Sequence, residues 1–169
     1  MSDNHYEFLT HWRVRGSLQE VSDVISNALD FPRWWPAVYL SAKEVDSGST
    51  NTGTAIELRT RGRLPYTLCW RAHPVENRAP FGLTFDADGD LVGRGIWRLS
   101  QDGEHTKLEF DWRVELRKPL LRWLSPLFRS VFVRNHDWAM ARGEESLERE
   151  LQRRRDAASS NAECSGVRA

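Results

Sequence analysis

The strongest constraint on the fold of this chain is a short segment of alternating apolar and charged residues, which a much longer helical segment follows. Between Lys107 and Arg117, apolar and polar side chains alternate without interruption. This period of two is typical of an antiparallel strand with one face in the core and the other in water. From Leu120 to Leu151 the period changes to about 3.6, which predicts a long helix. A strand with an aromatic inner face that leads into a terminal helix indicates a curved sheet around that helix.

The rest of the chain predicts six further strands and a first helix. Ser17 followed by Glu20 forms a capping box for a helix, and Pro32 either ends this helix or starts a new turn. Two Asp-Gly pairs, at 88–89 and 102–103, are signals for tight hairpins. Alternating patterns predict strands over 6–15, 38–45, 54–61, 66–75, 81–87 and 91–100. The sequence therefore predicts an α+β fold with a seven-stranded curved antiparallel sheet and a long C-terminal helix.

Composition and length restrict the class of protein. The length predicts a single domain over residues 1–152, and the basic and then small, polar sequence of 153–169 predicts a disordered tail. Lysine and arginine total 24 and aspartate and glutamate 24, and no nucleic-acid motif is present, so we expect no nucleic-acid partner. Two cysteines, no signal-peptide pattern and no apolar stretch of about 18 residues favour a cytoplasmic protein. Both a monomer and a homodimer are compatible with these features.

A rigid aromatic corner follows the first predicted helix, at Phe31-Pro32-Arg33-Trp34-Trp35-Pro36. With the order of elements, over about residues 5–152, this corner resembles the SRPBCC or START-like superfamily. That superfamily includes the birch pollen allergen and polyketide cyclase/dehydrase-type proteins. The resemblance implies a helix-grip fold, in which the sheet wraps around the C-terminal helix and leaves a hydrophobic cavity between them. It also implies that the cavity holds a lipid, a polyketide, a sterol or another apolar molecule.

The inward faces of the predicted elements supply the candidate ligand-binding residues. Large aromatic side chains bury much area and also line pockets for apolar or ring-bearing ligands. Of Trp34 and Trp35, we expect one at the cavity and the other in the core, and the sequence leaves open which. The candidates are Trp35, Leu58, Tyr66, Trp70, Phe85, Trp97, Phe110, Trp112, Phe128, Val131, Asn135, Trp138 and Arg142.

Two polar residues, Asn135 and Arg142, interrupt the apolar stripe predicted for the last helix. A buried cation needs a partner or a ligand. One interpretation is therefore that both residues fix the polar end of a bound molecule, such as a carboxylate or a carbonyl. The alternative is that Arg142 lies near the open end of the helix and extends its charge into water.

The distribution of titratable residues favours a receptor over an enzyme. The polar faces of the strands carry His11, Glu57, His73, Glu109, Asp111 and Glu115, and His136 lies beside the apolar helical stripe. We therefore expect no catalytic residue, and neither a metal ion nor another cofactor, because the histidines lack metal-ligand spacing. One alternative is a polyketide cyclase or dehydratase, which needs an acid or base in the cavity. Another is a lipid-transfer protein that touches membranes transiently through the apolar and arginine-containing segment 120–134.

Overall fold

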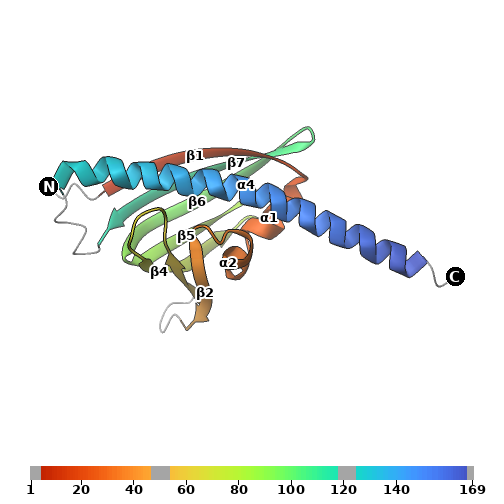
Figure 1. Ribbon diagram of the computed structural model, residues 1–169, viewed down its shortest axis with the longest axis horizontal. Helices are drawn as coiled ribbons and strands as arrows, with labels where there is room; N and C mark the ends of the chain where they lie inside the picture. The colour runs from red at the N-terminus through yellow and green to blue at the C-terminus, as the bar shows by residue number, and fades with distance from the viewer. Residues whose placement is uncertain (1–4, 47–53, 118–124, 167–169) are drawn as a thin grey trace.

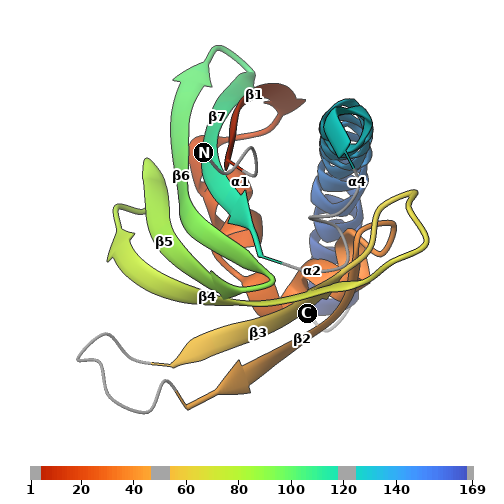
Figure 2. The same cartoon turned by 90° about the vertical axis from the view of Figure 1, so that its left-hand side faces the viewer.

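A seven-stranded antiparallel sheet in the order β1-β7-β6-β5-β4-β3-β2 forms the body of the molecule. The computed structural model describes residues 5–46, 54–117 and 125–166, without the side chains of 125–128 and 162–166. The strands are β1 (His5–Arg15), β2 (Tyr39–Val45), β3 (Ala55–Thr60), β4 (Leu68–Asn77), β5 (Gly82–Gly89), β6 (Leu91–Asp102) and β7 (His105–Leu116). Figure 2 shows the sheet curving from β1 and β7 through β5 to β2. The predicted α+β, seven-stranded architecture is confirmed.

Helices occupy the open side of the curved sheet (Figures 1 and 2). They are α1 (Leu18–Ile25), the short 3-10 helix η1 (Ala28–Asp30), α2 (Phe31–Trp34) and α4 (Ser125–Gly166). The predicted capping box opens α1: the Ser17 backbone N–H donates to Glu20 Oε2 at 2.8 Å, and Ser17 Oγ accepts from the Glu20 N–H at 3.3 Å. The aromatic corner forms α2, with Pro32 in its first turn, where its missing N–H costs nothing.

The inner face of the sheet is built from the residues that the alternation predicted. On β1, Tyr6, Phe8, Trp12 and Val14 are buried, whereas Leu9 on the opposite face is 60% exposed. Across β5 and β6, the ring of Phe85 lies on Gly95, where an added Cβ would come within 2.6 Å of the ring. One prediction for β5 is wrong: Phe81 is 65% exposed, because the strand begins at Gly82 and Phe81 belongs to the preceding turn.

The helix α4 is longer than the sequence predicted. It continues to Gly166, past the expected end near Leu151, and its last turns extend beyond the sheet in Figure 1. Residues 153–166 are thus helical, and the expectation of a disordered segment there is wrong. Local bonds support these turns, since Gln152 donates to Asp156 at 2.8 Å and the Ser159 hydroxyl donates to the Arg155 carbonyl at 3.0 Å. Within the described part of the chain, no helix is long and apolar enough to cross a membrane.

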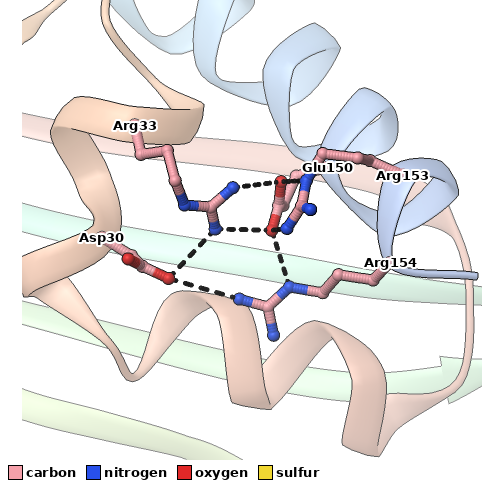
Figure 3. A network of polar contacts seen from close by, with 5 residues as sticks. All are labelled: Asp30, Arg33, Glu150, Arg153 and Arg154. Atoms are coloured by element: carbon pink, nitrogen blue, oxygen red, sulfur yellow. Dashed lines mark hydrogen bonds and ion pairs between the residues drawn. The ribbon is translucent and has the colours of Figure 1, made fainter. Parts of the chain in front are cut away.

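A charged network joins α4 to the aromatic corner (Figure 3). The carboxylate of Glu150, with 3% of its side chain exposed, accepts hydrogen bonds from Arg33, Arg153 and Arg154 at 2.7–2.9 Å. Arg33 also donates to Asp30 at 3.0 Å. The hydrogen bond from Arg153 lowers the pKa of Glu150 most, and the bonds from Arg33 and Arg154 lower it further against the effect of burial. Glu150 therefore stays ionised and fixes the corner against α4.

Candidate ligand-binding cavity

A cavity of about 280 Å³ lies between the concave face of the sheet and α4. Its walls come from β3 to β7, from the aromatic corner and from α4. Aromatic rings in contact form a continuous part of the wall: Trp97 stacks on Phe110 with centroids 4.2 Å apart, Trp112 stacks on Phe110 at 5.8 Å, and Trp70 is tilted against Trp112 at 5.8 Å. Such a wall offers apolar surface and aromatic faces to a ligand.

The structure brings most of the sequence-predicted site residues together around this cavity. Trp34 is buried beside Trp35 but is not among the lining residues, so Trp35 is the tryptophan of the corner that faces the cavity. Of the predicted set, the lining contains Trp35, Leu58, Tyr66, Trp70, Phe85, Trp97, Phe110, Trp112 and Asn135.

Three predicted residues of α4 do not line the cavity. Val131 is 36% exposed, Trp138 is half-buried against the edge of the core, and Arg142 forms an exposed ion pair with Glu145 at 2.8 Å. The expectation that these residues share an inward stripe is therefore wrong, and Arg142 extends to solvent. The side chain of Phe128 lies outside the described residues, as do most side chains of the segment 120–134.

The inward face of α4 is rotated by about one residue from the predicted stripe. Phe132, His136, Ala139 and Met140 line the cavity, and Gly143 continues the same face. The physical reason lies in side-chain size. Gly143 lets the indole of Trp12 lie against the helix, where an added Cβ would come within 2.7 Å of the ring. A prediction from apolar side chains does not count glycine as part of the buried stripe. Gly143 nevertheless determines which face of α4 packs against the sheet.

His136 is a titratable group of the cavity wall that the sequence analysis did not assign to the site. Its ring stacks on Phe8 with centroids 3.8 Å apart, and its Nε2 lies 3.5 Å from Thr10 Oγ1. Burial lowers the pKa of His136 to about 4, so the ring is neutral at pH 7. The one-residue rotation of α4 explains why a histidine predicted beside the stripe is found on the cavity wall.

A few further polar groups belong to the wall. The indole N–H of Trp70 donates to Thr60 Oγ1 at 3.2 Å. The indole N–H of Trp35 is buried and has no hydrogen-bond partner among the described residues. Burial raises the pKa of Tyr66 above its usual value, which keeps the phenol un-ionised. The cavity thus contains un-ionised donors and acceptors in a mainly apolar surface.

The other histidines with strand partners lie on the outer face of the sheet, as predicted. His11 is exposed and lies 3.4 Å from Glu109, and His73 pairs with Asp88. Neither lines the cavity. In the described ranges, no group of three or more histidine, cysteine, aspartate or glutamate residues is arranged to hold a metal ion.

A curved antiparallel sheet closed by a long C-terminal helix, with a cavity between them, is the helix-grip architecture of START-like proteins. Comparison with solved structures shows the same fold. The chain is similar to the Zhui aromatase/cyclase from Streptomyces, with a TM-score of 0.73 and 14% identity over 91% of this chain and 98% of that one. It is also similar to a START superfamily protein from Mycobacterium smegmatis, with a TM-score of 0.61 and 14% identity over 87% and 97% of the two chains.

A third similar structure is a STAR-related lipid transfer protein from Xanthomonas axonopodis, with a TM-score of 0.52 and 14% identity over 86% and 85% of the chains. No family model and no curated protein matches the chain. At these identities the likeness establishes the START-like fold, and the function has to be argued from the site.

Proposed function

We propose that this protein binds a small hydrophobic molecule in the cavity between the sheet and α4. The observation that carries the proposal is an apolar cavity of about 280 Å³ walled by stacked aromatic rings. Protein interiors normally pack without voids of this size. An apolar cavity of about 150 Å³ already binds benzene. The present volume therefore suits a ligand the size of two fused rings or a medium-length alkyl chain.

The polar groups of the wall suggest how such a ligand is oriented. The amide N–H₂ of Asn135, a lining residue, would donate to a carbonyl or ether oxygen of the ligand. The apolar part of the ligand would contact Trp97, Phe110 and Trp112. Structural neighbours described as an aromatase/cyclase and a lipid transfer protein are compatible with an apolar ligand.

Titration with the neutral apolar dye N-phenyl-1-naphthylamine tests the proposal. Wild-type protein should raise the fluorescence of the dye in a saturable way. Ala139→Phe places a ring in the cavity and should weaken dye binding by at least about tenfold, because an occupied cavity excludes the ligand. Ala141→Phe, at an exposed position of the same helix, is the matched control and should leave the affinity unchanged. Equal dye binding by both variants would exclude this cavity as the binding site.

A second candidate function is that of a cyclase or dehydratase, and His136 is the observation that favours it. The ring lies on the cavity wall beside the Thr10 hydroxyl, where it could take a proton from a bound substrate. A pKa of about 4 makes it a weak base at neutral pH. Conversion of a poly-β-ketone by wild-type protein, lost in His136→Gln while binding of the neutral dye persists, would identify the protein as such an enzyme.

A further inference from the structure

Two arginines without a carboxylate partner lie at one end of the cavity. Most arginines of the described surface form ion pairs, such as Arg94 with Asp86 at 2.7 Å. In residues 5–46, 54–117 and 129–161, however, Arg61 and Arg63 have no carboxylate within 4.0 Å, and both are exposed. Arg59 and Arg134 are also unpaired but do not line the cavity. Arg61 and Arg63 therefore form a cluster of positive charge beside the cavity that the described residues do not neutralise.

One side-chain amide fixes the loop that carries these arginines to α4. The backbone N–H of Arg63, in the loop between β3 and β4, donates to Asn135 Oδ1 at 2.8 Å. Gly62 allows this approach, because an added Cβ would come within 2.5 Å of Asn135 Nδ2. This bond holds the loop, and with it Arg61 and Arg63, against α4. Figure 2 shows this loop beside α4.

The cavity reaches the surface at this cluster. Arg61, Gly62 and Asn135 are all lining residues, and Arg61 is exposed. At the opposite end, the exposed lining residues include Glu76, which pairs with Arg78 at 3.4 Å. The two ends thus differ in charge: one carries unpaired arginines, and the carboxylate at the other is paired with Arg78.

We propose that the ligand is an anionic amphipathic molecule, with its apolar part in the cavity and a carboxylate, phosphate or sulfate group at Arg61 and Arg63. The proposal rests on the hydrophobic binding proposed above and adds the charge and the orientation of the ligand. A guanidinium presents several N–H donors in a plane that matches the oxygens of such groups.

Isothermal titration with naphthalene-1-acetate and its neutral amide tests this charge selection. Both compounds have the same fused rings, so the cavity contributes equally to both. Wild-type protein should bind the acid more tightly than the amide. Arg61→Gln and Arg63→Gln should each weaken the acid by about three- to tenfold and the amide by less than about twofold, since these exposed cations act on charge alone. Added salt should reduce the preference.

The matched control is Lys43→Gln on β2, because Lys43 is exposed, has no ion pair among the described residues and does not line the cavity. This variant removes one positive charge and should keep the wild-type preference. Equal affinity of wild-type protein for acid and amide would overturn the charge proposal and leave hydrophobic binding intact. Equal weakening of both compounds by the arginine variants would also overturn it.

Two further measurements separate the sources of the anion. Inorganic phosphate should compete with the acid only weakly, because it lacks an apolar part; competition as strong as that of the acid would overturn the amphipathic ligand. Cosedimentation with vesicles of anionic phospholipid is the second measurement. The proposal is overturned if wild-type protein cosediments, the arginine variants do not, and the titration shows no preference for the acid. The cluster would then bind a membrane surface.

Discussion

At the scale of single residues, His136 should make the stability of the protein depend on pH. Its pKa is about 4 in the folded protein, against 6.5 for a free histidine, because burial disfavours the charged ring. Between these values the unfolded chain binds a proton and the folded chain does not, so stability rises with pH. The contribution of the neutral ring is complete above pH 6.5 and is lost as the pH falls towards 4. The loss is at most roughly 3 kcal/mol.

His136→Phe tests this dependence, because phenylalanine can keep the stacking on Phe8 without titrating. Urea unfolding at pH 7.5, 5.5 and 4.5 should show the wild type losing free energy of unfolding relative to the variant as the pH falls. His11→Gln, on the exposed face of β1, controls for the removal of a histidine that is not buried. A constant difference between wild type and His136→Phe at all three pH values would contradict the prediction.

At the scale of secondary-structure elements, Gly143 determines how closely α4 approaches the sheet. Alanine favours a helix over glycine by about 1 kcal/mol at an unconstrained position. At position 143, however, the new Cβ would press on the rings of Trp12 and Trp35. Overpacking of this kind costs about 1–3 kcal/mol. Gly143→Ala should therefore lower the free energy of unfolding, although alanine is the better helix former. Ala141→Gly, at an exposed position of the same helix, is the control for helix propensity and should lower the free energy of unfolding by about 1 kcal/mol. Stabilisation by Gly143→Ala would show that the contact relaxes freely.

The end of α4 sets the boundary of the folded unit, which the sequence placed at residue 152. Arg155 donates to Glu20 at 2.9 Å and to the Arg15 carbonyl at 3.0 Å, and Arg153 and Arg154 donate to Glu150. A chain ending at residue 155 keeps these bonds. Its free energy of unfolding should therefore differ from that of the full chain by less than about 0.5 kcal/mol. A chain ending at 152 loses them and should be less stable by about 1–3 kcal/mol. Urea unfolding of both chains decides the boundary, and equal stability would favour residue 152.

Local sequence patterns were sufficient to predict most helices and strands. The inward face and the end of α4 depend on tertiary contacts and could not be predicted from local patterns. The alternation over 107–117 is sufficient for β7, and the pair Ser17 and Glu20 is sufficient for the start of α1, because each depends on neighbours in the chain. The face of α4 depends on Gly143 and on indoles from distant elements. The helical turns after residue 152 depend on bonds such as the one between Arg155 and Glu20. Both were therefore assigned incorrectly from sequence.

At the scale of the whole molecule, polar contacts hold the two ends of α4's packed region, and an incompletely filled space lies between them. Glu150 joins α4 to the aromatic corner, and Asn135 joins it to the loop between β3 and β4. Since these contacts set the distance between helix and sheet, the cavity can persist without a ligand. Unfilled apolar volume costs stability, as expected where a binding site is retained at the expense of the best packing.

Filling the cavity from within should therefore stabilise the empty protein and remove its response to ligand. Ala139→Leu adds apolar carbons on the cavity wall, worth about 0.8 kcal/mol for each buried methylene, and should raise the free energy of unfolding by about 1–2 kcal/mol. Ala141→Leu, exposed on the same helix, should change it by less than about 0.5 kcal/mol. With N-phenyl-1-naphthylamine at a hundred times its dissociation constant, the wild type should gain about 2.7 kcal/mol, and Ala139→Leu much less. A variant that is destabilised yet keeps the full ligand response would mean that Ala139 packs against protein and that the ligand binds elsewhere.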